Sequence, residues 1–262
     1  MFCRQDLPGQ PCIAGTAASV ASTAFSTCLK NEKGDTVETV EHLLSALFAL
    51  RIRNARISLT GSECPILDGS AATWLSLLQT AGTVTQRATW PVLKITKKQR
   101  VASNRGWLEV EPSSHFSVEM TVPLSDGTQQ SARFCEDDSF ETDIATARTF
   151  TFKEHLQPMR EKGLIQGGSL DNALVIDNGQ PVNKDGWRIQ NECARHKILD
   201  LLGDWALGGY LLQGRVRGYA SGHTLNHQLL EKILPQTQER LFARPTLSQG
   251  ADITREEQPM SA

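Results

Sequence analysis

The sequence ECARHKILDLLGD, residues Glu192–Asp204, combines the pattern of a buried helix with two residues of a metal site. His196 and Asp200 are four residues apart, so on a helix they project from one face, one turn apart. The intervening isoleucine and leucines fall mostly on other faces, where they would anchor the helix in a core. An imidazole and a carboxylate make half of a zinc site, since a catalytic zinc ion usually has three protein ligands and one open position. We therefore expect a third ligand from elsewhere in the chain.

A second buried helix is predicted over Val40–Leu50, because this run is apolar almost all round. Glu41 and His42 lie in its first turn, where burying an unpaired carboxylate and an imidazole is costly unless something charged is bound there. His42 is the natural third ligand, and with His196 and Asp200 it would complete a His-His-Asp set. A set of three ligands with an open fourth position activates water, whereas structural zinc sites are closed.

Three further side chains could assist such a site. Glu41 could take a proton from water, and His223, in a Gly-flanked loop, could protonate a leaving group or stabilise an oxyanion. Asp204 lies eight residues after His196, near the same helix face, and could hydrogen-bond a histidine. The spacing alone leaves a second interpretation open, because single histidines are often core or surface residues. The other histidines are interpreted in that way: His115, His155 and His227.

The composition is that of an ordinary globular protein. The chain has 262 residues, of which 39% are hydrophobic and 21% charged, with a net charge of -2. The chain has no excess of basic residues that would indicate a nucleic-acid partner. No apolar run reaches the roughly 18 residues that a membrane helix needs. Residues 1–30 lack the features of a secretory signal. We therefore expect a cytoplasmic, monomeric protein with no transmembrane segment.

The six cysteines are scattered, with no CxxC pair. This pattern fits reduced thiols in a cytosolic compartment better than a disulfide framework. We interpret all six as small buried side chains: Cys3, Cys12, Cys28, Cys64, Cys135 and Cys193.

The predicted elements divide the chain into two α+β halves. Residues 1–87 and 88–245 each hold a small sheet and about two helices, which predicts two packed domains with polar chemistry where they meet. Asp68 precedes a helix predicted over Ala71–Ala81, and a cap role and a functional role for it stay equally open. The polar tail, residues 246–262, is expected to be disordered.

Six motifs occur in a fixed order along the chain: TVEHLLSAL, PILDGSA, ARTF, GGSLDNA, RHKILDLLGD and SGHTLNH. In this order and at these intervals they resemble the UDP-3-O-acyl-N-acetylglucosamine deacetylases, zinc amidases of lipid A biosynthesis, from about Phe2 to Ile233. The resemblance implies zinc-dependent hydrolysis of the acetamide of UDP-3-O-acyl-N-acetylglucosamine, which gives acetate and UDP-3-O-acyl-glucosamine. It also implies two βααβ-type domains that sandwich their helices, with a βαβ insert over about residues 152–187 of the second domain.

The resemblance assigns roles residue by residue. The implied zinc ligands are His42, His196 and Asp200. The implied catalytic residues are Glu41 as general base, His223 as general acid and charge stabiliser, Thr149 as the hydroxyl that polarises the amide carbonyl, and Asp204 as the carboxylate that orients the catalytic histidine. The implied substrate contacts are Lys197, Phe150 and Asp68. An apolar passage for the acyl chain would be lined by Leu164, Ile165 and Val175, for which ordinary core is the alternative.

Some features depart from the family pattern. The family usually begins with further strand structure before the point that matches Phe2, so part of the first sheet is expected to be missing. Ala220 replaces a frequent lysine and Asn191 a common aspartate, and both changes could weaken substrate binding. The alternative function is an N-terminally truncated, catalytically inactive homologue that acts only as a binding or structural module. A zinc peptidase is the enzymatic alternative, but the sequence has no HExxH motif.

Overall fold

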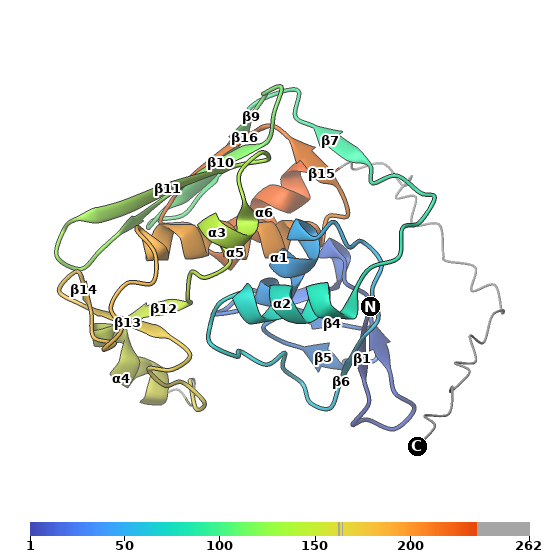
Figure 1. The fold of residues 1–262 in the computed structure, drawn as a ribbon, viewed down its shortest axis with the longest axis horizontal. Coiled ribbons are helices and arrows are strands. Elements are labelled where there is room, and N and C mark those ends of the chain that lie inside the picture. The colour runs from blue at the N-terminus through green and yellow to red at the C-terminus, as the bar shows by residue number, and fades with distance from the viewer. Residues whose placement is uncertain (162, 164, 235–262) are drawn as a thin grey trace, which may run out of the picture.

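The computed structural model describes residues 1–161, 163 and 165–234, and it has the predicted α+β class with helices between sheets (Figure 1). The tail predicted to be disordered lies outside the described residues. The elements of the first half are β1 (Phe2–Arg4), β2 (Cys12–Ile13), the 3-10 helix η1 (Ala17–Ser19), β3 (Val20–Ser22), β4 (Cys28–Lys30), β5 (Thr36–Val37), α1 (Glu41–Ala49), β6 (Ile57–Leu59) and α2 (Ala72–Ala81).

The second half contains more strands. Its elements are β7 (Val92–Lys94), β8 (Gln99–Ala102), β9 (Trp107–Glu111), β10 (Ser117–Pro123), β11 (Gln129–Cys135), α3 (Phe140–Asp143), β12 (Phe150–Phe152), α4 (Lys153–Glu161), β13 (Leu174–Asp177), β14 (Gln180–Pro181), α5 (Glu192–Ala206), β15 (Leu211–Gln213), β16 (Arg215–Tyr219) and α6 (His223–Ile233). None of the helices in the described part of the chain is long and apolar enough to cross a membrane.

A five-stranded sheet with the order β11-β10-β16-β9-β8 covers one side of the helical layer (Figure 1). Its strands alternate as a half-buried sheet requires, because Val118, Met120 and Val122 of β10 are buried while the intervening residues are less so. The opposite side of the helical layer carries two small sheets of the first half, β2-β1-β6 and β3-β4-β5. Helices α1 and α5 are therefore enclosed between the sheets of the two halves.

The outer face of the five-stranded sheet carries a row of alternating charges, which we call the charge row. Arg100 of β8 lies opposite Glu109 of β9, and Glu109 lies opposite Arg217 of β16. The row continues through Glu119 of β10 to Arg133 of β11. Glu109 is buried and paired with the guanidinium groups of both neighbours at 3.2 and 2.8 Å. Opposite charges on facing residues stabilise the strand register.

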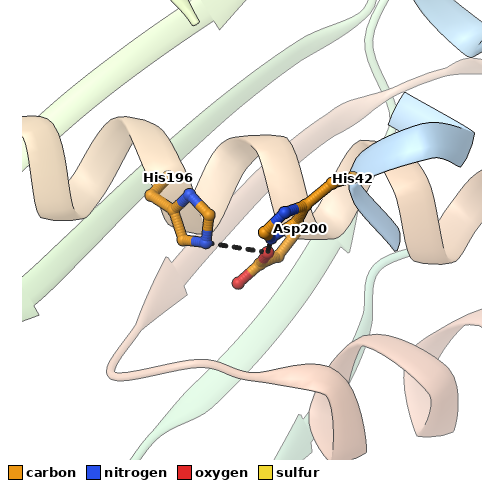
Figure 2. A group of neighbouring side chains, drawn as sticks. All are labelled: His42, His196 and Asp200. Atoms are coloured by element: carbon orange, nitrogen blue, oxygen red, sulfur yellow. Dashed lines mark ion pairs between the residues drawn. The ribbon is translucent and has the colours of Figure 1, made fainter. Parts of the chain in front are cut away.

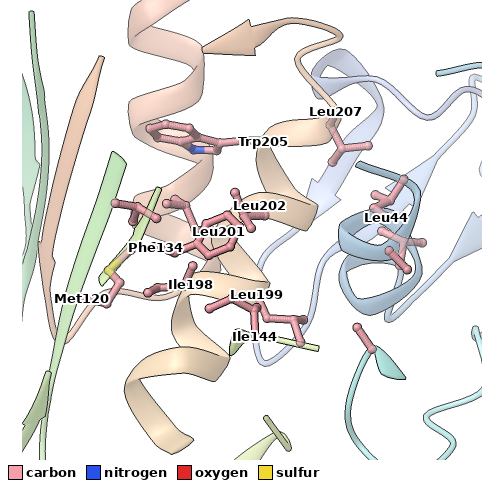
Figure 3. Close-up of a cluster of buried hydrophobic side chains, with 14 of the residues drawn as sticks. Leu44, Met120, Phe134, Ile144, Ile198, Leu199, Leu201, Leu202, Trp205 and Leu207 are labelled. Atoms are coloured by element: carbon pink, nitrogen blue, oxygen red, sulfur yellow. The ribbon is translucent and has the colours of Figure 1, made fainter. Parts of the chain in front are cut away.

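Helix α5 passes through the centre of the core, where it packs against α1, α6 and the five-stranded sheet. Ile198 and Leu201 face Met120 and Phe134 of that sheet (Figure 3). Gly203 is where α1 crosses α5: a Cβ added there would lie 2.8 Å from the carbonyl carbon of Glu41 and closer to its oxygen. Because glycine has no side chain, the first turn of α1 can rest directly on α5.

The predicted insert is present as the unit β12–α4–β13. Strands β12 and β13 pair in parallel with α4 between them, which is the βαβ connectivity (Figure 1). Strand β14 returns antiparallel after a tight turn at Asn178 and Gly179, both with positive φ, as a two-residue hairpin requires. The domain bounds given above remain predictions.

The interpretation of all six cysteines as reduced thiols is wrong for one pair. Cys3 and Cys12 form a disulfide, and they face each other across the antiparallel pair β1–β2 with Cα atoms 4.1 Å apart. The pairing was not predicted because the two-residue strand β2 leaves no periodic pattern. Among the others, three are free and buried, as expected, and one is free and partly exposed: Cys28, Cys64, Cys193 and Cys135.

Candidate metal centre

Three potential metal ligands meet where α1 crosses α5. His42 is the second residue of α1, and His196 and Asp200 lie one turn apart on α5, all of them buried. Their donor atoms lie within 4.8 Å of one another. His196 Nε2 is 3.2 Å and His42 Nε2 is 3.7 Å from Asp200 Oδ1 (Figure 2). The structure therefore brings together the three residues that the sequence suggested as ligands.

The chemistry of this group fits a cation. His196 Nδ1 lies 3.0 Å from the carbonyl oxygen of Ala147, which can only accept, so Nδ1 is assigned the proton and Nε2 the lone pair. Burial and the neighbouring His196 ring lower the pKa of His42 to about 3, so this ring is neutral. Asp200 Oδ1 has no hydrogen-bond partner among the described residues. Lone pairs that converge on an unpartnered carboxylate oxygen repel one another unless a positive ion lies between them.

The second oxygen of Asp200 has a cationic partner. Lys197 donates a hydrogen bond from Nζ to Asp200 Oδ2 over 2.8 Å. Burial acts to raise the pKa of Asp200, but its neighbours His196, Lys197 and His223 oppose it and hold the pKa well below its usual range. The Lys197 ammonium also lies 5.4 Å from the ring centroid of Phe150, the first residue of β12. Lys197 and Phe150, both predicted to touch substrate, therefore border the ligand group.

Glu41 is the first residue of α1, and its carboxylate is buried beside the ligand group. Its Oε2 accepts a hydrogen bond from the backbone N–H of Thr27 over 3.1 Å, and its Oε1 lies 3.6 Å from His223 Nε2. Burial raises the pKa of Glu41 to about 7. A carboxyl group in this condition can take up or release a proton near neutral pH.

His223 is the first residue of α6, with Gly222 at the N-cap, so the prediction of a loop position was wrong by one residue. The ring is buried with Nδ1 2.9 Å from Asp204 Oδ2. Burial acts to lower the pKa of His223, but the carboxylates of Asp204, Glu41 and Asp200 outweigh it and raise the pKa to about 10. The ring is therefore an imidazolium at neutral pH, held by Asp204 as the sequence suggested.

Sequence reasoning missed two residues around Asp204. Thr27 donates from Oγ1 to Asp204 Oδ1 over 2.6 Å, and Asn226 donates from Nδ2 to Asp204 Oδ2 over 2.8 Å. Asn226 lies in the motif SGHTLNH, three residues after His223, where helical spacing could have revealed it. Thr27 lies in an irregular segment before β4, far along the sequence from Asp204, and carries no such signal.

Thr149 and Asp68 lie at a junction between the halves. Thr149 is half-buried, and its backbone N–H donates to the carbonyl oxygen of Gly69 over 2.7 Å. Asp68 accepts two hydrogen bonds from Ser70 and pairs with Arg188. Asp68 therefore does not cap α2 directly. No hydrogen bond of the Thr149 hydroxyl is present among the residues described.

A buried arginine next to Thr149 was also missed. Arg148 is 1% exposed and donates to Glu192 Oε1 over 2.7 Å, to Asp185 Oδ2 over 2.8 Å and to the Gly186 carbonyl over 2.6 Å. Glu192 is the first residue of α5. The Arg148–Glu192 ion pair therefore connects the segment that carries the Ala147 carbonyl to α5, the helix that carries His196.

Two of the three residues predicted to line an acyl passage lie in the described part of the insert. Val175 is buried in β13, and Ile165 is partly exposed with a φ of 52°. Leu164 lies outside the described residues. Their role remains a prediction.

Comparisons with known proteins agree in one description. The family model described as UDP-3-O-acyl N-acetylglycosamine deacetylase matches residues 1–235. The UDP-3-O-acyl-N-acetylglucosamine deacetylase of Pasteurella multocida is 37% identical over 239 residues, 89% of this chain and 78% of the relative. The proteins of the same name from Idiomarina loihiensis and Myxococcus xanthus are each 38% identical, over 90% and 97% of this chain and 79% and 82% of their own lengths.

Proposed function

The chain belongs to the family of UDP-3-O-acyl-N-acetylglycosamine deacetylases, and on this premise we propose that it hydrolyses the acetamide of UDP-3-O-acyl-N-acetylglucosamine. The products are acetate and UDP-3-O-acyl-glucosamine, a step of lipid A biosynthesis. The observation that carries the proposal is the buried His-His-Asp group with an unpartnered carboxylate oxygen, flanked by Glu41 and His223. The proposal includes a monomeric chain that acts in the cytoplasm without a nucleic-acid partner.

The proposed metal is zinc, held by His42, His196 and Asp200. Two imidazole nitrogens and one carboxylate oxygen form a donor set typical of catalytic zinc, with a fourth position left for the reactants. When bound, zinc supplies Lewis-acid activation of water and of the acetamide carbonyl. The Nδ1–H of His196, bonded to the Ala147 carbonyl, keeps its ring oriented with Nε2 toward the metal position.

Glu41 is the proposed general base. With a pKa of about 7 it accepts the proton that water loses on attacking the carbonyl carbon. The backbone N–H of Thr27 holds one oxygen of Glu41, so the other oxygen keeps a fixed position beside His223.

His223 is the proposed general acid. Its Nδ1 is bonded to Asp204, which leaves the Nε2–H pointing to the side of Glu41 and the ligand group. The imidazolium stabilises negative charge on the carbonyl oxygen, and it then gives its Nε2 proton to the amine as the carbon–nitrogen bond breaks. Thr149 is proposed to polarise the same carbonyl through its hydroxyl.

The remaining assignments concern substrate binding. Lys197 and Phe150 would contact the sugar and Asp68 a polar group of the substrate. The acyl chain would lie along the insert, beside the residues predicted for it: Leu164, Ile165 and Val175. An inactive binding module is not favoured, because a complete set of buried, mutually oriented charged residues has a large desolvation cost with no use in a purely structural role.

The test is release of free amine from UDP-3-O-acyl-N-acetylglucosamine by the purified chain, with and without a zinc chelator. Turnover that the chelator abolishes and added zinc restores would support the proposal. Absence of turnover in folded, zinc-loaded protein would refute it and leave the binding module as the function.

A further inference from the structure

Thr27 connects the proposed base to the proposed acid. It lies directly before β4, in the first half of the chain, and is 2% exposed. Its backbone N–H donates to Glu41 Oε2 over 3.1 Å, and its hydroxyl donates to Asp204 Oδ1 over 2.6 Å. Among the described residues, it is the only one that hydrogen-bonds both carboxylates. Asp204 in turn accepts the Nδ1–H of His223.

We propose that Thr27 is a positioning residue that fixes the separation between Glu41 and His223. The inference rests on the proposed function, because base and acid are roles in that reaction. Glu41 comes from α1, while Asp204 and His223 come from α5 and α6. Thr27 bonds Glu41 and Asp204, and its hydroxyl also lies 3.4 Å from His223 Nδ1, so one residue contacts groups from three helices.

The hydroxyl group carries the specific part of this role. It is the one partner of Asp204 Oδ1 among the described residues, whereas Oδ2 is shared by His223 and Asn226. Without the Thr27 hydroxyl, the Asp204 carboxylate can rotate. The His223 ring, which is bonded to that carboxylate, would then rotate as well. This motion would change the 3.6 Å separation between His223 Nε2 and Glu41 Oε1. A β-branched residue suits the task because its side-chain torsion is restricted.

The same segment contains a matched control. The hydroxyl of Thr23 lies 2.9 Å from that of Thr224, at an exposed position, and bonds neither Glu41 nor Asp204. Valine has nearly the shape of threonine without the hydroxyl. Thr27→Val and Thr23→Val therefore remove the same group from two sites of one segment.

The experiment compares Thr27→Val, Thr27→Ser and Thr23→Val in deacetylation, with kcat and KM measured separately. We expect kcat of Thr27→Val to fall about 10–100-fold, as for other residues that orient a catalytic group. KM should stay within about twofold of wild type, since the substrate is not touched. Thr27→Ser should restore most of kcat, and Thr23→Val should behave as wild type. If the Thr27→Val protein does not fold, because its valine methyl group lies against the Asp204 carboxylate, Thr27→Ala is measured in the same way.

A spectroscopic measurement tests the geometry without turnover. The Nδ1 proton of His223, bonded to a buried carboxylate, should give a downfield proton resonance in protein with isotopically labelled histidine. The resonance should shift or broaden in Thr27→Val, and it should persist in Thr27→Ser.

Two kinds of result would overturn the inference. One is a wild-type kcat in Thr27→Val, or a serine variant as impaired as the valine variant. The other is an unchanged Nδ1 resonance in Thr27→Val. If wild-type protein does not deacetylate the substrate, the proposed function fails and the resonance alone decides whether Thr27 holds His223.

Discussion

Replacing Gly203 with alanine would push apart the two helices that carry the proposed metal ligands. The added Cβ would lie 2.8 Å from the carbonyl carbon and 3.0 Å from the Cα of Glu41. Non-bonded carbon atoms have their optimal separation at about 3.5–4.0 Å, so α1 and α5 would have to separate by roughly 0.7 Å or more. His42 moves with α1, whereas His196 and Asp200 stay with α5.

A displacement of this size exceeds what a metal site tolerates, because ligand distances must match within about 0.2 Å. We expect the affinity for zinc to fall roughly 10–100-fold, the range seen when ligand orientation is disturbed. The free energy of unfolding of Gly203→Ala provides a second, independent test of the close contact between α1 and α5. In an open helix position, alanine instead of glycine would stabilise by about 1 kcal/mol. Overpacking at the crossing costs about 1–3 kcal/mol, so we expect no gain and a net loss of up to about 2 kcal/mol.

The assay is competition for zinc with a fluorescent chelator, together with urea unfolding of the metal-free protein. Gly61→Ala is the control, since a Cβ there meets nothing within 4 Å. The reasoning would be refuted if Gly203→Ala bound zinc as tightly as wild type and was more stable by about 1 kcal/mol.

The remaining predictions concern single side chains. His42→Ala should lower bound zinc, measured by elemental analysis, whereas Glu41→Ala should keep the zinc and lose turnover at least about 100-fold; normal turnover would exclude Glu41 as the base. Arg148→Met leaves the Glu192 carboxylate buried without its partner, so urea unfolding should show a loss of about 3–5 kcal/mol, and the double methionine variant should recover part of it. Burial acts to raise the pKa of Glu109, but the surrounding cations lower it below its usual value. The unfolded chain then binds more protons in acid, so stability should fall as the pH drops through the folded-state pKa, and Glu109→Gln should flatten that fall in pH-dependent unfolding.

The three proposed metal ligands could be selected from the sequence because their signals are local. His196 and Asp200 are four residues apart on an evidently apolar helix, and helical geometry places them together without knowledge of the fold. His42 was identifiable as a polar residue at the start of a helix that must be buried. Their meeting point at Gly203 was not predictable, because it depends on how α1 and α5 cross.

The residues that orient the site required the structure. Thr27 acts partly through its backbone N–H, which every residue except proline has, so its side chain leaves no trace of that contact in the sequence. Arg148 and Glu192 are 44 positions apart and could be joined only once both were placed. The pairing of Cys3 with Cys12 failed for a similar reason, since it depends on a strand of two residues.

The charge row on the outer face of the five-stranded sheet has a consequence for how this surface can vary during evolution. Each interior member of the row lies opposite a residue of contrary sign on both sides: Glu109, Arg217 and Glu119. Reversing one interior charge would set like charges against each other at two places at once, whereas a reversal at Arg100 or Arg133 would do so at one. The charge at an edge position can therefore be reversed by a single substitution at a smaller cost. An interior position can change sign only together with its neighbours. Substitutions along this row should accordingly be correlated in alternating order across the sheet, although the residues are scattered over more than a hundred positions of sequence.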